Sequence, residues 1–368
     1  MELLLHPVIL ALLKIAVVVL GFVMLTGTVL TLLERKWMSA VQDRIGPNRA
    51  NLPGLWNFRG RGTLHLAADG LKSIFKEDTV PAGVDLFIFT IAPFFGFIAA
   101  LVSWAIIPFA APIGDFKFQI TDVNAGILLV FAVTSLGVYG TVLAGWSSNS
   151  KFALLGAARG TSQMLSYEIF LGLSLVGVFM VNGSVQVSVL VANQNEYWFG
   201  DVIPKWGIIT QPVAFFLFFT AMLAEAKRLP FDAPEGESEI IAGYFMEYSG
   251  MRYAAFMLAE YIAIVTISAL TATLFFGGYH VPWLHGDGFH LFGAFLAVPV
   301  WLVVVLQVLA FGFKVTFFCW LIIILRWTIP RFRFDQIMEL GWKKMLPLSL
   351  GNIVVTALVL LAIDNWNF

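Results

Sequence analysis

The sequence contains 368 residues, of which 59% are hydrophobic and 12% charged, and its formal net charge is −1. Soluble domains contain roughly 45–50% apolar and about 25% charged residues, so this composition excludes an ordinary water-soluble fold. Apolar stretches of about 20 residues recur along the chain, each long enough to cross a hydrocarbon core of ~30 Å. We therefore predict an all-α, polytopic integral membrane protein with a single membrane domain over residues 1–368.

About eight transmembrane helices are predicted in chain order. The first is followed by Glu34-Arg35-Lys36 and lacks a small-residue cleavage site, so a retained helix is expected and not a signal peptide. The apolar stretch Phe289–Leu325 is too long for one untilted helix, which leaves open a tilted helix or an interfacial segment leading into a span. The predicted spans are Val8–Leu33, Leu86–Phe109, Ala125–Gly145, Leu165–Val181, Gln211–Ala226, Ala255–Phe276, Val300–Leu325 and Leu348–Ala362.

Positive charge is concentrated in alternate loops. Of the 22 Lys and Arg residues, 18 lie in four loops, which are Glu34–Val80, Trp146–Arg159, Lys227–Arg252 and Arg326–Lys344. By the positive-inside rule this side is cytoplasmic, or its organellar equivalent, and both termini face the other side. In a bacterium the chain would be a multi-pass protein of the inner membrane with periplasmic termini.

The first cytoplasmic loop, residues 34–80, contains an amphipathic segment. Apolar residues recur there at helical spacing, while Asp69, Lys72 and Lys76 gather on another face. This pattern predicts a helix at the membrane surface. From the residues alone, membrane anchoring and a site-lining role are equally open. The apolar positions are Leu64, Ala67, Ala68, Leu71, Ile74 and Phe75.

Residues able to hold a redox centre are scarce. The single cysteine, Cys319, permits neither a disulfide framework nor a thiolate set for zinc or an iron–sulfur cluster. The five histidines have no paired metal-ligand spacing, and no Gly-rich phosphate loop follows a strand pattern. We therefore expect no metal site and no nucleic-acid partner, and any redox centre belongs to a partner protein.

Three acidic residues are predicted inside or at the ends of spans: Glu168, beside Tyr167, Glu225 and Glu260. An ionisable group inside a bilayer costs at least ~2.5 kcal/mol near the centre, so it normally faces a protein interior or a wet cavity. Such carboxyl groups are candidates for a proton relay. The alternative, structural carboxylates near helix ends, remains open.

The densest acidic run lies in the loop 227–252. It extends from Asp232 through Glu235, Glu237 and Glu239, and Glu247 follows. Its apolar and aromatic flanks predict that the loop packs against membrane or protein and leaves its carboxylates in a confined polar chamber. Arginines could neutralise these carboxylates or steady an anionic intermediate, although for any single arginine topology and lipid headgroup contact are the favoured explanation. The basic candidates on this side are Arg35, Arg44, Lys72, Arg159, Arg228, Arg326, Arg331 and Arg333.

Several loop motifs together carry a family resemblance. They are Glu34-Arg35-Lys36 with Asp43-Arg44-Ile45-Gly46-Pro47-Asn48, Ala68-Asp69-Gly70-Leu71-Lys72 with Phe75-Lys76-Glu77, Gly145-Trp146-Ser147-Ser148-Asn149-Ser150-Lys151, Ser166-Tyr167-Glu168, Arg228-Leu229-Pro230-Phe231-Asp232 through Glu239, Glu247-Tyr248-Ser249-Gly250 and Pro330-Arg331-Phe332-Arg333-Phe334-Asp335-Gln336. Their order and spacing closely resemble the quinone-site membrane subunit of respiratory complex I, an NADH:quinone oxidoreductase.

This resemblance implies a subunit without a redox centre of its own, which joins the electron-transfer arm to the proton-pumping membrane arm. Quinone would be the substrate, and FMN and iron–sulfur clusters would lie on subunits of the peripheral arm. Other membrane-arm subunits and lipids would be further partners. The positions matching the quinone chamber are Arg35, Arg44, Asp69, Lys72, Arg228, Phe231 and Asp232. Those matching the acidic proton path are Tyr167, Glu168, Glu225, Glu235, Glu237, Glu239, Glu247 and Glu260.

Two alternatives accompany this prediction. The equivalent membrane subunits of membrane-bound hydrogenases and of photosynthetic or archaeal dehydrogenases share much of the helix plan. A stand-alone secondary transporter would instead place its site at mid-membrane between repeated halves. The sequence has no evident repeated halves, and its acids cluster towards one face.

Overall fold

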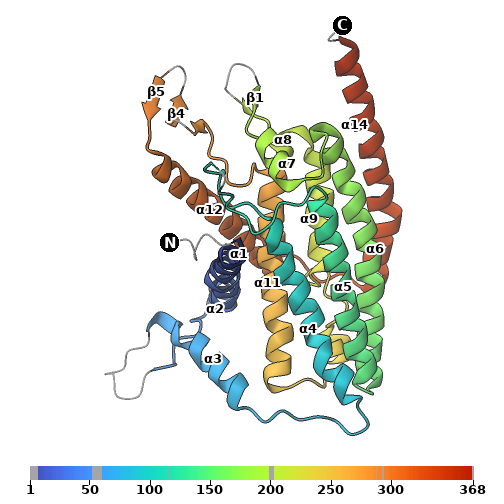
Figure 1. Ribbon diagram of the computed structural model, residues 1–368. Coiled ribbons are helices and arrows are strands. Elements are labelled where there is room, and N and C mark those ends of the chain that lie inside the picture. Colours follow the sequence, from blue (N-terminus) through green and yellow to red (C-terminus); the bar gives the residue numbers. More distant parts are fainter. Residues whose placement is uncertain are drawn as a thin grey trace.

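The computed structural model describes residues 7–51, 60–114, 116–198, 203–286, 288–291 and 294–366. Long helices dominate it (Figure 1). The N-terminal segments α1 (Pro7–Ile15), η2 (Ala16–Met24) and α2 (Leu25–Val41) follow one another without a break. The other long helices are α4 (Leu86–Val102), α5 (Gly126–Ser147), α6 (Lys151–Asn182), α9 (Pro212–Glu225), α11 (Gly250–Phe275), α12 (Val300–Thr328) and α14 (Leu346–Trp366).

Short elements connect the long helices. The short helices are η3 (Gly60–Gly62), α3 (Leu64–Phe75), η4 (Ser103–Ile106), α7 (Val187–Asn193), α8 (Gly207–Thr210), α10 (Glu237–Ile240), η5 (Gly243–Phe245), α13 (Phe334–Glu339) and η6 (Leu340–Met345). The strands are β1 (Tyr197–Trp198), β2 (Ile203–Pro204), β3 (Leu284–His285), β4 (Gly288–Leu291) and β5 (Ala294–Ala297).

The prediction of a polytopic all-α membrane fold is confirmed. Within the described residues, seven helical stretches are long and apolar enough to cross a membrane. They are Val8–Val41, Leu86–Ile106, Gly126–Ser147, Lys151–Asn182, Gly250–Phe275, Val300–Thr328 and Phe334–Ile363. The remaining predicted span corresponds to α9, which has 14 residues and is about 21 Å long at 1.5 Å per residue. Because α9 is mostly buried among the longer helices, it needs no full-length lipid-facing surface.

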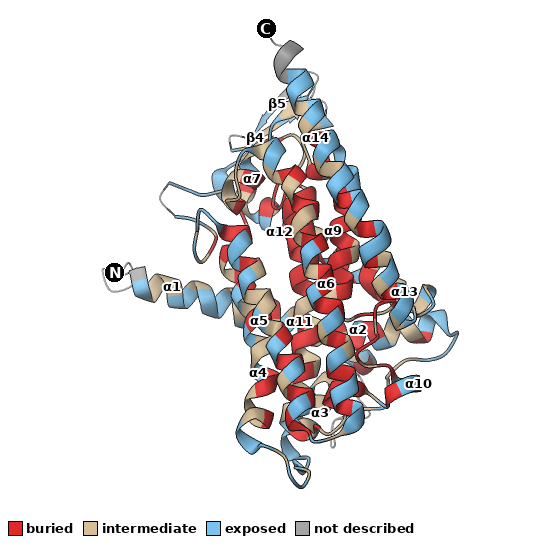
Figure 2. Cartoon of the chain, turned by 90° about the vertical axis from the view of Figure 1, so that its right-hand side faces the viewer, coloured by how far each residue is buried: buried red, intermediate tan, exposed pale blue. Residues whose placement is uncertain are grey.

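Several of the long helices form an upright bundle, and the N-terminal helix and α12 are inclined to it (Figure 1). Helices α4, α5, α6 and α11 run side by side, and α14 lies along α6 and projects beyond it (Figure 1). The N-terminal helix, in contrast, is seen almost end-on in Figure 1 and from the side in Figure 2. It therefore crosses the bundle, and this path carries the charged end of α2 to α11 and α12.

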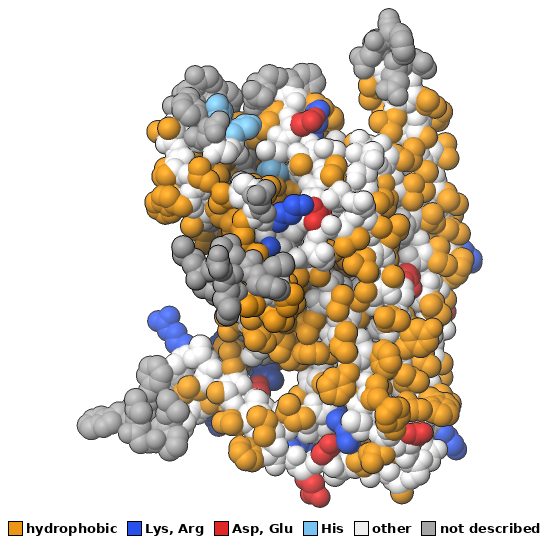
Figure 3. All heavy atoms as spheres, in the orientation of Figure 1, with side chains coloured by type: hydrophobic (Ala, Val, Ile, Leu, Met, Phe, Trp, Pro, Cys, Tyr) orange, Lys and Arg blue, Asp and Glu red, His pale blue; other side chains and the backbone are white. Residues whose placement is uncertain are grey.

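On the face shown in Figure 3, apolar side chains cover most of the surface of the long helices, and charged side chains lie along the lower edge, with a smaller number in the upper half. Exposed large residues such as Phe216, Phe313 and Leu358 are typical of this surface, at 66%, 73% and 61% exposed. The interior is also apolar, with fully buried Trp104 donating a 2.8 Å hydrogen bond from Nε1 to Oγ1 of Thr266. A protein that is apolar on both its inside and its outside is suited to a lipid environment.

The predicted amphipathic helix is α3, which stands away from the main bundle (Figure 1). It contacts α2 and α11, and none of its residues is fully buried. Leu71, Ile74 and Phe75 are 55%, 60% and 83% exposed. Its apolar face is therefore available to lipid or to a partner subunit.

The stretch Phe289–Leu325 is neither one long helix nor a helix extended by tilt. Its first residues form β4 and β5 of an antiparallel sheet with β3, in which Phe289 faces Leu296 and His290 faces Phe295. Pro299 then occupies the N-cap position of α12, and the helix begins at Val300. The predicted start of the span at Val300 is therefore confirmed, but the hairpin before it was not predicted, because an apolar hairpin and an apolar helix have the same composition.

Several helices extend further into the charged loops than hydropathy indicates, including the C-terminal helical stretch, which begins at Phe334 and not at Leu348. Helix α2 continues beyond Leu33 to Val41, and α6 begins at Lys151, well before the predicted start at Leu165. A polar helical turn at a membrane boundary lowers the mean hydropathy without ending the helix. As a result Glu34 and Arg35 lie on a rigid helix and not in a loop.

The acidic loop is fixed to α6 through glycines. A Cβ atom on Gly156 would lie 2.7 Å from Cα of Gly243 and 2.8 Å from the carbonyl oxygen of Pro234. Gly243 has φ +59°, and a Cβ there would lie 1.8 Å from the same oxygen. Only glycine permits this approach at both positions. The contact places the residues from Pro234 to Gly243 next to the interior of the bundle.

Candidate functional site

The centre of the candidate site is a buried group of alternating charges. Arg228 lies between two carboxylates, with Nη1 3.7 Å from Oε2 of Glu34 and Nη2 3.4 Å from Oε2 of Glu260. Arg326 forms a second ion pair with Glu34 from the end of α12. The side chains of Glu34, Arg228 and Glu260 are each only 7% exposed. Buried charges of this kind persist because each has an opposite charge beside it.

Four separate segments supply this group, which we call the central charge cluster. Glu34 comes from α2, Glu260 from α11 and Arg326 from α12, while Arg228 lies in the turn after α9. In that turn, the amide of Arg228 bonds the carbonyl of Leu223, and the carbonyl of Arg228 accepts from the amide of Phe231. The guanidinium also lies 4.6 Å from the ring centre of Tyr261. The turn therefore aims Arg228 into the bundle.

The surrounding charges govern proton binding in the loop. Burial alone would lower the pKa of Arg228, but the carboxylates of Glu260 and Glu34 raise it, so Arg228 stays charged. Burial raises the pKa of Glu235 well above its usual range, and neighbouring Glu260 raises it further. Glu235 therefore holds a proton that an exposed glutamate would have released.

A cavity of about 370 Å³, here called the middle cavity, opens beside the central charge cluster. Charged residues line one part of it and aromatic or methionine side chains the rest. The charged lining residues are Glu34, Arg35, Arg228, Glu235, Glu260 and Arg326. Such a chamber can hold a polar, redox-active ring against hydrogen-bonding groups and exchange protons with it.

A second cavity, also about 370 Å³ and here called the outer cavity, lies under the loop after α2. It is lined by Arg44, Arg49 and His65 together with the turn from Ile45 to Asn48, and it shares Arg35 and Met38 with the middle cavity. The two cavities are therefore adjacent along α2. Together they lead from the α3 side of the molecule to the buried charges.

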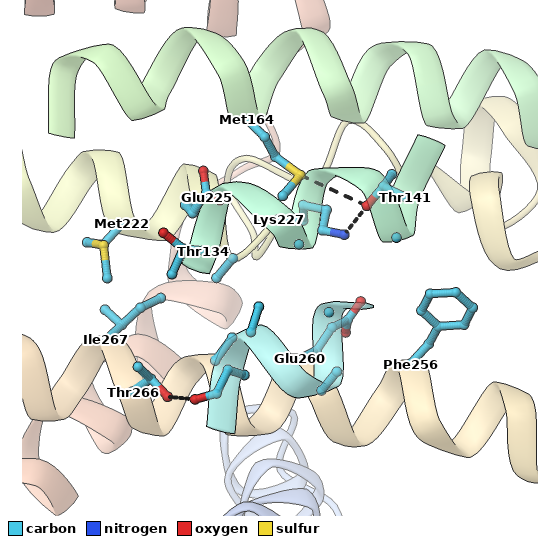
Figure 4. A pocket seen from close by; sticks show the side chains of 18 of the residues that line it. Thr134, Thr141, Met164, Met222, Glu225, Lys227, Phe256, Glu260, Thr266 and Ile267 are labelled. Carbon is cyan, nitrogen blue, oxygen red and sulfur yellow. Dashed lines mark hydrogen bonds between the residues drawn. The ribbon is translucent and has the colours of Figure 1, made fainter. Parts of the chain in front are cut away.

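A third, smaller cavity of about 110 Å³, the inner cavity, lies deeper in the bundle (Figure 4). It shares Glu260 with the middle cavity and also contains Glu225, Lys227 and Tyr244. Most of its remaining lining is apolar or small. The three cavities thus form a series joined by shared side chains, from Arg44 to Glu225.

The predicted acidic residues fall into two groups. Glu225 and Glu260 line the inner cavity, and Glu235 lines the middle one. Glu168 on α6 accepts a hydrogen bond from Ser135 on α5. Glu225 and Glu235 each retain one buried carboxylate oxygen without a hydrogen-bond partner among the described residues. Unsatisfied buried oxygens of this kind are sites for water or for a proton.

The other predicted acids lie elsewhere. Glu239 is half exposed and pairs with Arg159 at 2.6 Å, and Glu247 lies between η5 and α11, partly buried. The side chain of Glu237 lies outside the part that the structure describes. Tyr167 is fully buried, and its hydroxyl donates a 2.8 Å hydrogen bond to the carbonyl oxygen of Ile337. The geometry of Tyr167 therefore serves the packing of α6 against α13.

The predicted quinone-chamber residues are also divided between two places. Arg35 and Arg44 line the outer cavity, and Arg35 forms a 2.5 Å ion pair with Asp69 of α3. Lys72 is exposed one turn further along α3. The Arg35–Asp69 pair is nearly half exposed on both sides, so it holds α3 in register with α2 while contributing little to stability.

Phe231 and Asp232 lie in the acidic loop and line none of the three cavities. Phe231 is buried between the rings of Tyr167 and Phe332, with ring centres 5.5 and 5.6 Å away. The carbonyl of Asp232 accepts a 2.6 Å hydrogen bond from Arg331. Burial raises the pKa of the Asp232 carboxyl to about 6, although Arg331 opposes this. An acid of that pKa can donate and recover a proton near neutral pH.

Sequence reasoning did not single out Glu34, Lys227 or Tyr244 as site residues, and Arg326 was only one of several basic candidates. Glu34 looked like the polar end of the first span. One signal was available: Glu34 follows an apolar helix in unbroken register, so its side chain can point back into the bundle. For Lys227 and Tyr244, only the folded loop reveals their common location.

Comparison with known proteins decides the family. The family model described as NADH dehydrogenase matches residues 13–357. The chain is 43% identical over 345 residues to an H-type subunit of NADH-quinone oxidoreductase from Geobacter metallireducens, covering 92% of this chain and 94% of that protein. It belongs to the family of H-type subunits of NADH-quinone oxidoreductase.

Relatives in other bacteria give the same result. The H-type subunit of NADH-quinone oxidoreductase from Leptospira biflexa is 41% identical over 351 residues, covering 91% of each chain. NADH-quinone oxidoreductase subunit 8 of Rhodothermus marinus is 41% identical over 345 residues, covering 94% of this chain and 95% of the other. The protein is thus a multi-pass membrane subunit of complex I, and its partners are other subunits of that complex.

Proposed function

We propose that this subunit forms the quinone-binding tunnel of complex I and the beginning of its acidic proton path, at the junction of the peripheral and membrane arms. The observation that carries the proposal is the series of three cavities, in which Arg35 and Met38 join the outer to the middle cavity and Glu260 joins the middle to the inner one. The quinone head would enter the outer and middle cavities, and protons would pass through the inner cavity.

The chemistry of the lining supports this division. A quinone that is reduced gains negative charge and then protons, so its binding site needs cations and proton donors. Arg35 and Arg44 provide positive charge at the opening, and Asp232, with its pKa raised to about 6, is a proton donor in the acidic loop, close enough to Glu260 and Arg228 to interact with their charges. The exposed apolar face of α3 offers a contact for the membrane end of the tunnel.

Quinone reduction and proton movement would be coupled through the charge that develops on the quinone head. A negative charge developing on the quinone head near the middle cavity alters the potential at Glu235 and Glu260. Those carboxyl groups then take up or release protons, and the rearranged charges bias the acidic loop between arrangements. The partner subunits would supply the FMN and iron–sulfur clusters that deliver electrons. The three relatives compared above are named as subunits of NADH-quinone oxidoreductase, which favours this function over the hydrogenase alternative.

The quinone assignment is tested with Asp232→Asn and Arg44→Ala in the assembled complex. Quinone reductase activity should fall by about 10-fold or more, while electron transfer from NADH to a hydrophilic acceptor persists. Arg333→Ala is the control, because Arg333 is a 77% exposed arginine on the same side of the protein that pairs with Asp335 at the surface. Equal loss of both activities in an intact complex would refute the assignment.

The proton-path assignment needs a separate readout. Glu225→Gln or Glu260→Gln should reduce protons pumped per NADH oxidised, because an amide cannot carry the proton that a carboxyl group carries. Vesicles containing the complex, with a pH-sensitive dye, measure this ratio. Fully normal coupling in both single variants would count against the path.

A further inference from the structure

The turn after α9 places a lysine between the quinone-side and interior acids. Lys227 has φ +55°, a left-handed conformation that turns its side chain into the inner cavity (Figure 4). Its Nζ donates to Oγ1 of Thr141 at 2.8 Å and to Oη of Tyr244 at 3.2 Å. Both acceptors are neutral. Lys227 forms no ion pair with a carboxylate among the described residues, unlike neighbouring Arg228.

A cation held mainly by hydroxyl groups is poised to lose its proton. Burial lowers the pKa of Lys227, while the carboxylates of Glu260, Glu235 and Glu225 oppose that shift. The protonation of Lys227 therefore depends on whether these acids are charged. Arginine, which stays protonated in proteins, would not respond in this way.

Tyr244 connects the lysine to the central charge cluster. Its hydroxyl accepts from Lys227 and donates to Oε1 of Glu260 at 3.4 Å. Glu260 lines both the middle and the inner cavity, and Glu225 lies on the same side of the inner cavity as Lys227 (Figure 4). A chain of hydrogen-bonding groups thus runs from Glu260 through Tyr244 to Lys227, with Glu225 beside it.

We propose that Lys227 is the proton carrier between the quinone-side carboxyl groups and Glu225. The inference rests on the proposed function and adds to the acidic path a basic member that switches between charged and neutral forms.

The transfer balances in two steps. First, the Lys227 side chain leaves Thr141 and reaches across the inner cavity to Glu225; an N–H bond of its ammonium breaks and the proton forms an O–H bond on the Glu225 carboxylate, which leaves a neutral amine and a neutral acid. Next, the amine takes the hydroxyl proton of Tyr244 as that oxygen receives a proton from the Glu260 carboxyl group. Tyr244 ends unchanged, Lys227 is recharged, and Glu260 becomes a carboxylate beside Arg228. No electron moves and no co-reactant is required.

Two lysine variants separate proton transfer from simple charge compensation. Lys227→Met removes the charge, whereas Lys227→Arg keeps it but cannot give up a proton. If Lys227 carries protons, both variants in the assembled complex should lower protons pumped per NADH by ~10-fold or more. Lys343→Met is the matched control, because Lys343 is 72% exposed and pairs only with Glu339 at the surface among the described residues.

The pH dependence of coupled turnover distinguishes proton transfer by Lys227 from a purely structural role, because a structural role would leave this dependence unchanged. Deprotonation of Lys227 at high pH should produce an alkaline limb in coupled turnover, and Lys227→Arg should lack it. The titratable groups facing Lys227 are Glu225 on α9, Glu235 and Tyr244 in the loop, and Glu260 on α11, while Glu168 on α6 acts on Glu225. Tyr244→Phe keeps the aromatic ring but removes the hydroxyl group that joins Glu260 to Lys227. This variant therefore tests the proposed proton route if the Lys227 variants fail to assemble.

Wild-type pumping and an unchanged alkaline limb in Lys227→Arg would overturn the proposal, and so would normal pumping in Tyr244→Phe. Quinone reduction is measured as well in vesicles treated with an uncoupler. This measurement distinguishes a failure of the Lys227 proposal from a failure of the proposed quinone site. Uncoupled reduction that persists in the Lys227 variants while pumping falls supports the inference. Uncoupled reduction that is normal in Asp232→Asn and Arg44→Ala would instead refute the quinone site, whatever Lys227 does.

Discussion

Replacing Arg228 by methionine should leave the buried carboxylate of Glu260 without its ion-pair partner. Arg228 lies 3.4 Å from Glu260 and 3.7 Å from Glu34, and all three side chains are 7% exposed. Glu34 would keep its ion pair with Arg326, whereas Glu260 would keep two hydrogen-bond partners that carry no positive charge, the Tyr244 hydroxyl at 3.4 Å and the carboxyl group of Glu235. Methionine preserves most of the apolar volume of the stem, so the lost charge dominates the effect.

The cost can be estimated from the geometry. Two unit charges 3.4 Å apart attract by about 5 kcal/mol at an effective dielectric constant of 20. Removing one partner of a buried pair typically costs about 3–5 kcal/mol, because the other charge stays desolvated. Arg228→Met should therefore destabilise the subunit by ~3–5 kcal/mol. Adding Glu260→Gln removes the stranded charge and should recover at least ~1 kcal/mol.

Thermal dissociation of the purified complex in lipid nanodiscs compares the stability of the wild type, Arg228→Met and the double variant Arg228→Met with Glu260→Gln. The midpoint for Arg228→Met should fall by on the order of 5 °C or more, and the double variant should lie between it and the wild type. Arg333→Met is the control, since its 3.3 Å pair with Asp335 is about 70% exposed and worth at most ~1 kcal/mol. Equal midpoints for Arg228→Met and Arg333→Met, or a double variant no better than the single one, would refute the reasoning.

Two further predictions concern the acidic loop and the opposite face. Gly243→Ala should abolish assembly, because its Cβ would lie 1.8 Å from the Pro234 carbonyl oxygen. Gly172→Ala is the control: a Cβ there has nothing within 4 Å, so the variant should be neutral or stabilise α6 by up to ~1 kcal/mol. Western blots of membrane fractions compare the amounts of the two variants. Burial raises the pKa of Asp122, but hydrogen bonds from Lys117, Gln186 and Ser188 outweigh it and lower the value to about 2. Because the folded-state pKa is lowered, its stabilisation is present above about pH 4 and is lost as the pH falls towards 2. Asp122→Asn should therefore flatten the fall in thermal midpoint between about pH 5 and pH 3, and an unchanged slope would contradict this assignment.

Hydropathy was sufficient to predict the number and order of the long helices, but not the residues at which each helix begins and ends. The strongly apolar α4 begins at the predicted residue, Leu86, but ends at Val102 and not at Phe109 as predicted. The extension of α2 beyond Leu33 was missed, since charged residues can continue a helix outside the hydrocarbon region. The hairpin before Val300 was missed for a different reason, because its apolar residues carry no signal that distinguishes strand from helix.

The candidate site was predictable in its residue types more than in its pairings. The sequence indicated buried acids such as Glu260 and nearby arginines such as Arg228. It could not indicate that these two meet, or that Glu34 joins them, because the contacts bring together residues from distant helices. The role of Lys227 depends on a single left-handed backbone conformation, which no periodic pattern encodes.

The contact of Gly156 with Gly243 also limits how the family can vary. At both positions any side chain would collide with backbone, which cannot be relieved by a change of rotamer. A saturation library over the acidic loop should therefore tolerate substitutions at exposed Ile241 but reject all nineteen at Gly156 and Gly243. Selection acting on packing alone would then make these two glycines as invariant as any acid of the proton path, so invariance by itself cannot identify the residues that move protons.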